Sequence, residues 1–228
     1  MADLEQFRRG YLSASTFARR AFTEMERLSS DEFWYRPARN GVKKLVEEIL
    51  PLAMTAKFLD IPGRRVRCKY LGESDDPCDG AVTFKGGWVD HGFLNPKYFI
   101  EVTSAQFPRE HLKREALARY GSVFEDPGIY REGSKKKGND RIVSVAVAQD
   151  GDAVVTAVAE WVYKAVRNKL GRSYPKPCWL IVAIEPERPL HLSEWLTLVQ
   201  GFPRDLVKQD FDSSFLVHTG VGAVYHAG

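Results

Sequence analysis

Apolar and polar positions recur along the chain with two different periods, and each period predicts a different kind of element. Over residues 42–59 apolar positions recur every three or four residues, which predicts an amphipathic helix that Pro51 bends or restarts. Over residues 65–70 basic residues alternate with apolar or aromatic ones, which predicts a strand with one face in water. Residues 179–184 are apolar at every position, as in a strand that is covered on both faces.

The remaining segments complete an α/β pattern. Residues 23–27 and 31–35 are predicted to lie in or beside one helix that Pro37 ends. The further predictions are strands at 80–84 and 97–105, helices at 111–120, 153–170 and 192–198, and a strand pair near 215–217 and 223–225. Asp152 is the predicted N-cap of the helix at 153–170. This order predicts a mixed sheet flanked by helices.

Composition describes an ordinary globular protein. The chain has 228 residues, of which 44% are hydrophobic and 28% charged, and this excludes disordered and coiled-coil classes. We predict a single domain over residues 1–228, with a helical N-terminal segment over about 1–40, a core over about 42–185 and a C-terminal part over 186–228. The net charge of +3 is too small to indicate a nucleic-acid partner by itself.

Several kinds of site and location are excluded or disfavoured by what the sequence lacks. The three cysteines, Cys68, Cys78 and Cys178, lie far apart, which predicts free thiols rather than a zinc site. The first twenty residues contain no apolar leader, and the longest uncharged apolar stretch, 49–56, is too short to cross a membrane. We therefore expect a cytoplasmic protein with no membrane partner. No GxxxxGK[ST], GxGxxG, GxSxG or HExxH motif is present.

Two carboxylates form the strongest candidate for chemistry. Asp79 precedes the second predicted strand, and Glu101 lies inside the third between Ile100 and Val102. An ionised carboxylate in an apolar strand is costly unless it is paired or bound to a metal. Two carboxylates on adjacent strands can converge and supply oxygen ligands to Mg²⁺, which can activate water to cut a phosphodiester. The alternative is that Glu101 forms an ion pair with a neighbouring Arg or Lys.

These residues and the order of elements resemble the PD-(D/E)XK (restriction-endonuclease-like) nuclease superfamily over about residues 42–185. Pro77–Cys78–Asp79 is similar to the PD half of its motif with one residue inserted, and Glu101–Val102–Thr103 is similar to the (D/E)XK half. The resemblance implies an αβββαβ core, with a mixed central sheet flanked by helices. It also implies that Asp79 and Glu101 bind Mg²⁺ or Mn²⁺, and that Glu48 or Glu47 is a further acidic residue of the site.

The chain departs from this motif at Thr103, where the family has a lysine that positions the attacking water. A hydroxyl group cannot supply that positive charge. Either another lysine reaches the site, for which Lys85 and Lys164 are the candidates, or the site is inactive. The predicted catalytic residues are therefore Asp79, Glu101, Thr103, Lys85 and Lys164, and the predicted metal ligands are Asp79, Glu101 and Glu48.

Basic residues follow the candidate site in the sequence. Six of them are predicted to contact phosphates: Arg109, Lys113, Arg114, Lys135, Lys136 and Lys137. The alternative is a solvated, charged surface. Trp88, His91 and Phe93 lie between the second and third strands, where they either stack on bases or pack against the sheet edge.

Three hypotheses follow for the function. The first is a metal-dependent nuclease that hydrolyses DNA or RNA, with DNA favoured. The second is an inactive nuclease-like module that binds nucleic acid or a protein partner, and the third is an interaction domain with no nucleic-acid role. Nucleases that cut both strands are often dimers, so a homodimer remains open, and no feature of the sequence decides it.

Overall fold

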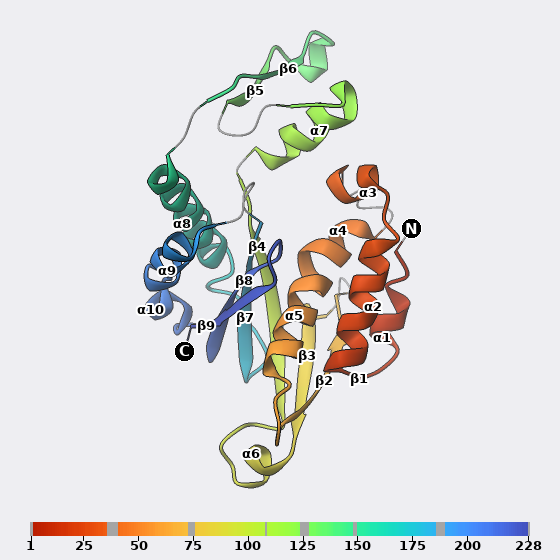
Figure 1. The fold of residues 1–228 in the computed structure, drawn as a ribbon, viewed down its shortest axis with the longest axis vertical. Helices are drawn as coiled ribbons and strands as arrows, with labels where there is room; N and C mark the ends of the chain where they lie inside the picture. Colours follow the sequence, from red (N-terminus) through yellow and green to blue (C-terminus); the bar gives the residue numbers. More distant parts are fainter. Residues whose placement is uncertain are drawn as a thin grey trace.

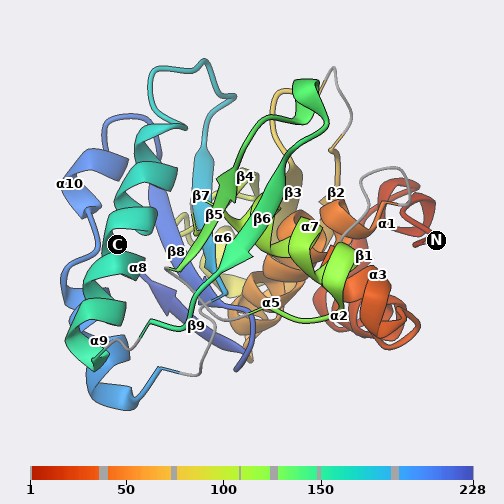
Figure 2. The same ribbon diagram turned by 90° about the horizontal axis from the view of Figure 1, so that it is seen from above.

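The computed structural model describes residues 2–35, 41–72, 76–107, 109–123, 128–147, 150–185 and 190–227. A mixed seven-stranded sheet lies at its centre with helices packed against it, so the predicted α/β class is confirmed (Figures 1 and 2). In the order of the sheet the strands are β1 (Leu12–Ser13), β2 (Arg65–Tyr70), β3 (Gly80–Lys85), β4 (Lys97–Ala105), β7 (Cys178–Ile184), β8 (Ser213–His218) and β9 (Ala223–His226).

The sheet has an antiparallel half and a parallel half. Strands β1 to β4 are antiparallel neighbours, β4, β7 and β8 run parallel, and β9 returns antiparallel to β8. The parallel pairs need long crossovers, and helices that follow β4 and β7 supply them. Strand β7, apolar throughout, is buried at every position as predicted. Strand β1 was not predicted, because two residues carry no readable period.

N-terminal helices cover one face of the antiparallel half. They are α1 (Glu5–Arg8), α2 (Ala14–Glu26) and a continuous helix made of α4 (Val42–Lys44), a π-helical turn (Leu45–Ile49) and α5 (Leu50–Leu59). Pro51 lies in the first turn of α5, so the helix continues past it. The core beneath these helices contains Val66, Tyr70, Val82 and Phe84 from β2 and β3.

The first predicted helix is two helices in the structure. Helix α2 ends at Glu26, and α3 (Ser30–Tyr35) begins after a turn. The Ser29 hydroxyl accepts a hydrogen bond from the Glu32 amide at 3.2 Å, and the Glu32 carboxylate accepts one from the Ser29 amide at 3.2 Å. This reciprocal cap starts a new helix. Pro37, the predicted helix end, lies outside the described residues.

The other face of the sheet is covered over β4, β7 and β8. Three helices pack there: α8 (Gly151–Arg167), α9 (Leu192–Gln200) and α10 (Arg204–Val207). Their buried apolar residues form one core cluster with those of the sheet. The N-cap of α8 is Asp150, whose carboxylate accepts a hydrogen bond from the Ala153 amide at 2.7 Å. The predicted cap, Asp152, is wrong by two residues and lies inside the first turn.

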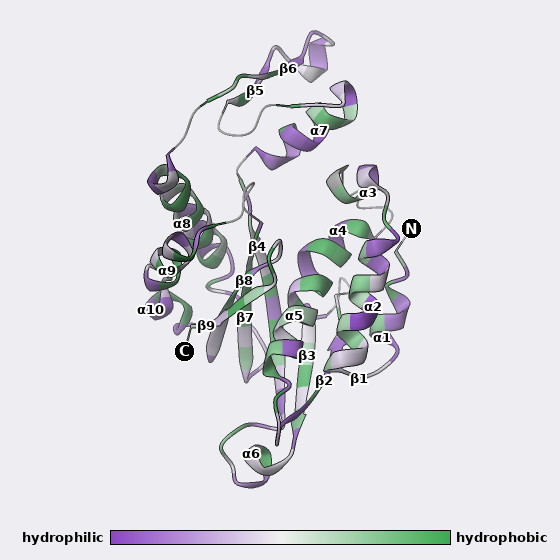
Figure 3. Cartoon of the chain, viewed as in Figure 1, coloured by the Kyte–Doolittle hydropathy of each residue, from purple (hydrophilic) through white to green (hydrophobic). Residues whose placement is uncertain are grey.

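A small layer extends from the carboxyl end of β4 (Figure 1). It contains α7 (Glu110–Tyr120) and a hairpin of β5 (Ile129–Glu132) and β6 (Arg141–Ser144), whose tip is the 3₁₀ turn Lys135–Lys137. This hairpin lies between the helices predicted at 111–120 and 153–170, where the sequence predicts no strand. Hydrophilic residues prevail along this tip (Figure 3).

At the opposite end of the molecule a short helix, α6 (Gly87–Asp90), connects β3 to β4 (Figure 1). Trp88 in this helix and Phe93 after it are exposed. Among the described helices, none is both long and apolar enough to span a membrane.

The burial of His218 on β8 should make the stability of the fold depend on pH. The residue is 3% exposed, and both ring nitrogens lack hydrogen-bond partners among the described residues. Burial lowers the pKa of His218 below its usual value, so the unfolded chain takes up a proton before the folded chain does. We expect stability to fall as the pH drops below about 6.5 and the fall to end once the folded-state pKa is passed. Urea unfolding of His218→Phe should show a smaller fall between pH 7.5 and 5; curves that stay parallel to wild type would contradict this.

Candidate active site

Asp79 and Glu101 face each other across two neighbouring strands. In the antiparallel pair of β3 and β4, Gly80 lies opposite Ile100, so the next step of the register places Asp79 opposite Glu101. Directly opposite residues point to the same face of a sheet. The Val102 amide donates a hydrogen bond of 2.8 Å to Oδ2 of Asp79, which fixes this carboxylate against β4. The structure therefore brings the two predicted carboxylates together.

Both carboxylates are difficult to ionise at this position. Burial raises the pKa of Asp79, although the hydrogen bond from Val102 and nearby cations oppose the shift. Burial also raises the pKa of Glu101, and the charge of Asp79 raises it further. The Glu101 side chain is only 7% exposed. A cation beside the pair relieves both the burial cost and the repulsion.

Lys169 provides a cation at this pair. It lies in the turn after α8, and its Nζ donates a short hydrogen bond to Oε1 of Glu101. The Tyr174 hydroxyl donates a hydrogen bond of 3.0 Å to the Lys169 carbonyl oxygen. In the sequence, Lys169 falls on the apolar side of the helix predicted over 153–170, but it is not among the predicted site residues. A lysine on a buried helix face needs an anionic partner.

Thr103 lies on the same face of β4 as Glu101, two residues further along the strand. It is half-buried and is paired in register with Val182 of β7. The position that carries lysine in the (D/E)XK motif therefore points to the same side as the carboxylates. The positive charge beside Glu101 comes from the turn after α8 instead.

An open pocket of about 410 Å³ contains these groups. Helix α4, the π-helical turn, the loop before β3, strand β4 and the turn after α8 contribute its walls. The charged residues that line it are Lys44, Glu48, Asp76, Asp79, Glu101, Lys169 and Arg172. Arg172 is exposed, and it lowers the pKa of Glu101 and Asp79 through its charge. The pocket thus brings anions and cations together in an exposed recess.

Glu48, rather than Glu47, lines this pocket. The π-helical turn presents Glu48 to the Tyr70 hydroxyl, which donates a short hydrogen bond to its Oε2. Burial raises the pKa of Glu48, and the charge of Asp79 adds to the rise. Glu47 turns away and forms an ion pair with Arg114 at 3.1 Å.

The donor set suits a hard cation such as Mg²⁺ or Mn²⁺. Mg²⁺ is usually held by one or two carboxylates together with waters and substrate phosphates. Asp79 and Glu101 supply two such carboxylates at a solvent-accessible pocket. Across the described parts of the chain, no three His, Cys, Asp or Glu side chains gather closely enough to enclose an ion. Glu48 therefore does not complete a three-carboxylate cage with the pair.

The two predicted lysines lie elsewhere. Lys85 ends β3 opposite Arg65, at the far end of the strand from Asp79. Lys164 is exposed on α8 and does not line the pocket with Lys169. The structure does not bring either of them to the carboxylates.

The predicted phosphate-contacting residues divide into two groups. Arg109 donates to the Ile129 carbonyl at 2.8 Å, Arg114 forms ion pairs with Glu47 and Glu110, and Lys113 is half-buried. The other group is the 3₁₀ turn of the β5–β6 hairpin, where Lys136 and Lys137 are exposed and the Lys135 side chain lies outside the described residues.

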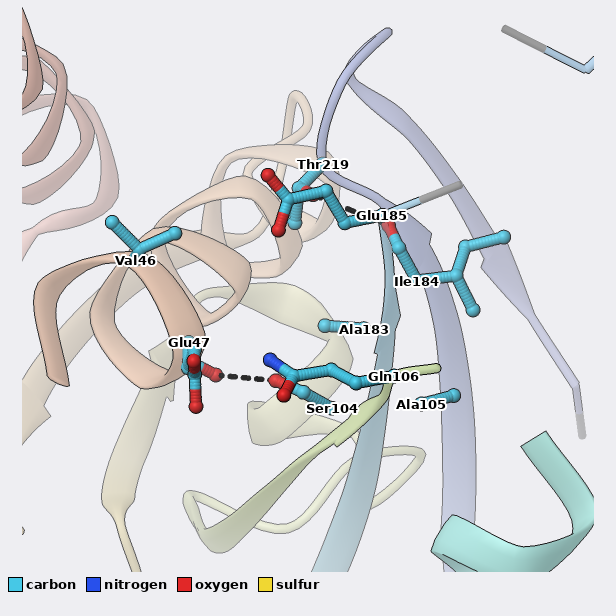
Figure 4. A pocket seen from close by; sticks show the side chains of 9 residues that line it. All are labelled: Val46, Glu47, Ser104, Ala105, Gln106, Ala183, Ile184, Glu185 and Thr219. Atoms are coloured by element: carbon cyan, nitrogen blue, oxygen red, sulfur yellow. Dashed lines mark hydrogen bonds between the residues drawn. The ribbon is translucent and has the colours of Figure 1, made fainter. Parts of the chain in front are cut away.

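A second, much smaller pocket lies at the carboxyl ends of β4 and β7 (Figure 4). Glu47, Ser104, Gln106 and Thr219 line it, and the Ser104 hydroxyl donates to the Glu47 carbonyl at 3.4 Å. Its volume of about 10 Å³ is the space of one water molecule. It is too small to admit a substrate, whereas the open pocket that contains Asp79 and Glu101 has room for one.

Comparison of the chain with protein-family models, with curated proteins and with solved structures gave no match.

Proposed function

We propose that this protein is a metal-dependent nuclease that hydrolyses phosphodiester bonds of DNA or RNA, with DNA favoured. The observation that carries the proposal is the opposition of Asp79 and Glu101 in an open pocket, with Lys169 on Glu101. The order α5, β2, β3, β4, α8, β7, with α6, α7 and the β5–β6 hairpin inserted into it, is compatible with the αβββαβ core of the PD-(D/E)XK superfamily. It supports the same proposal, because Asp79 directly precedes the second of these strands and Glu101 lies in the third.

In this proposal the three residues have separate roles. Asp79 and Glu101 would hold Mg²⁺ or Mn²⁺. Such an ion would supply Lewis-acid activation of a water molecule and would offset charge at phosphorus. Lys169 donates hydrogen bonds to the attacking water or to a non-bridging phosphate oxygen. The water oxygen forms a bond to phosphorus and the water loses a proton. The bond from phosphorus to the leaving oxygen breaks, and the leaving oxygen takes up a proton.

The direct test is cleavage of single-stranded and duplex DNA and of RNA by the purified protein with Mg²⁺. We expect product with Mg²⁺ and none with EDTA. Asp79→Asn and Glu101→Gln should each lower the rate about a thousandfold, because each removes a charged ligand from the metal. Circular dichroism checks that both variants fold. Metal-dependent cleavage that survives in both variants would refute the proposed site.

The ion pair of Glu101 with Lys169 supports a second candidate, in which the chain binds nucleic acid without cutting it. A carboxylate that is held by lysine has one oxygen less for a metal, and Thr103 supplies no charge. Binding that weakens steeply with salt, with no product under any divalent ion, would select this candidate.

A further inference from the structure

Among the described residues, no helix covers one face of the sheet over β2. Helices α1, α2 and α5 contact β2 on its Tyr70 side, whereas α8 lies over β4 and β7 (Figure 2). Along β2 the residues on the other side, Arg65, Arg67 and Lys69, are exposed or half-buried while the alternate ones are buried. The predicted wet face of this strand is therefore confirmed, and it lies on the α8 side of the sheet.

Cations from three strands gather on this uncovered face. The register places Arg65 opposite Lys85, and it aligns Arg67 with Thr83 and Lys97. We call the five residues Arg65, Arg67, Lys69, Lys85 and Lys97 the basic stripe. The first acidic residue of these three strands on this face is Glu101 of β4, four residues beyond Lys97.

Folding alone does not explain the basic stripe. Like charges that lie directly opposite on a sheet are destabilising, and Arg65 and Lys85 are such a pair. Within the described residues, none of the five forms an ion pair with a carboxylate. Arg67 donates to the Tyr11 carbonyl at 2.6 Å, and Nζ of Lys97 lies 4.2 Å from the centre of the Phe99 ring. An anionic ligand would remove the repulsion that the fold leaves.

The basic stripe and the acidic pair lie on the same face of the sheet. Residues two apart on a strand share a face, so Lys85, Thr83, Ala81 and Asp79 lie in one line on the α8 side. Each step of two residues is about 7 Å, which gives the line a length of roughly 20 Å. Thr83 is half-buried and Ala81 is buried along this line, and Asp79 at its end lines the pocket of the candidate site.

Aromatic side chains lie at the far end of the stripe. Trp88 is 49% exposed and Phe93 is 77% exposed, with their ring centres 6.5 Å apart. Arg65 and Lys85 line an open recess at this end together with Asp60 and Arg64, and the Arg64 guanidinium lies 6.0 Å from the centre of the Trp88 ring. A row of cations together with exposed aromatic rings is how proteins bind single strands, whose unpaired bases are free to stack.

We propose that the basic stripe binds the phosphates of a single-stranded nucleic acid segment, with bases stacked on Trp88 and Phe93, and leads that strand to Asp79 and Glu101. The delivery of the strand for cleavage rests on the proposed nuclease function, but the binding does not. A second copy of the chain is disfavoured as the occupant of this face, because two basic stripes repel each other.

The test compares two triple charge reversals. Arg65→Glu/Lys85→Glu/Lys97→Glu changes the stripe and keeps like charges opposite each other at positions 65 and 85. Arg19→Glu/Lys57→Glu/Lys208→Glu is the matched control, since these exposed residues lie on other elements. Binding of fluorescent oligothymidylate and of a duplex of equal length is measured by anisotropy in EDTA, from 50 to 300 mM salt.

We expect the stripe variant to bind oligothymidylate about 100-fold more weakly at 50 mM salt and the control to change less than threefold. The slope of log affinity against log salt should fall by about 2, since three cations each contribute about 0.7 on a single strand. Trp88→Ala should weaken single-strand binding about tenfold and leave duplex binding unchanged.

The outcomes separate this proposal from the nuclease proposal. Equal affinity of the stripe and control variants for oligothymidylate would overturn the stripe, even if the wild-type protein cuts DNA. Stripe-dependent binding without cleavage under Mg²⁺ or Mn²⁺ would support the stripe and refute the nuclease. Tighter binding to duplex, with no effect of Trp88→Ala, would refute a single-stranded ligand.

Discussion

Lys169→Met should lower the rate of Mg²⁺-dependent phosphodiester cleavage about a thousandfold. Methionine keeps the length and the apolar stem of lysine but removes the charge that contacts Oε1 of Glu101. A group that positions water or stabilises charge in a transition state contributes typically 10²–10⁴-fold to a rate. The measurement is single-turnover cleavage at saturating protein, which separates the chemical step from binding.

A second substitution tests whether the lysine acts by its place beside Glu101. Thr103 points to the same side of β4 as Glu101, so Thr103→Lys in the Lys169→Met background restores a cation to the motif position. We expect this double variant to recover at least tenfold of the lost rate. A larger loss in Lys164→Met or Lys85→Met than in Lys169→Met would show that the charge comes from one of the lysines that the sequence suggests.

The loss must also be separated from unfolding. Removing one partner of a buried ion pair leaves the other charge unpaired, and such changes cost up to about 3–5 kcal/mol. The Lys169 side chain is 20% exposed, so water offsets part of this cost. Urea unfolding of Lys169→Met beside Lys169→Met/Glu101→Gln measures it. A folded single variant that has lost cleavage places the effect in the chemistry.

The acidic pair could be predicted from the sequence because its signature is local. Glu101 lies between apolar neighbours in a strand, and that placement is costly without a partner. Lys169 follows it by 68 positions, and the contact depends on how α8 packs on β4. No local pattern fixes which turn of a helix lies above which strand position. Periodicity therefore placed Lys169 on the buried side of its helix without identifying its partner.

The position of the basic residues in space is also hard to predict from the sequence. The run Lys135–Lys137 stands out in the sequence, whereas the stripe is spread over three strands as single residues. The alternation in β2 predicted a wet face, but the alignment of Arg65 with Lys85 depends on register. On α7 and the hairpin, by contrast, the structure pairs Arg114, Arg119 and Arg131 with carboxylates. Clusters of charge in the sequence thus do not show which basic residues are paired with carboxylates, or which isolated ones lie together on one face of the sheet.

Trp179→Ala should destabilise the protein by about 3–5 kcal/mol, the usual cost of removing a large buried aromatic side chain. Trp179 is 6% exposed on β7, beside Ile100 of β4 in the parallel register. The centre of its ring lies 3.9 Å from that of Tyr98, on which it stacks, and 5.3 Å from that of Phe215. These three rings join β4, β7 and β8.

Trp88→Ala is the matched control, since the same residue type at an exposed position should change stability by less than about 1 kcal/mol. Urea unfolding followed by circular dichroism measures both variants. A loss below about 1 kcal/mol in Trp179→Ala would mean that the aromatic cluster does not hold the strands together. We expect the two variants to differ in nucleic-acid binding as well, because Trp88 is exposed in the segment after Lys85 whereas Trp179 is buried. Trp179→Ala should leave single-strand affinity unchanged at temperatures where it is folded, whereas Trp88→Ala should lose affinity without losing stability.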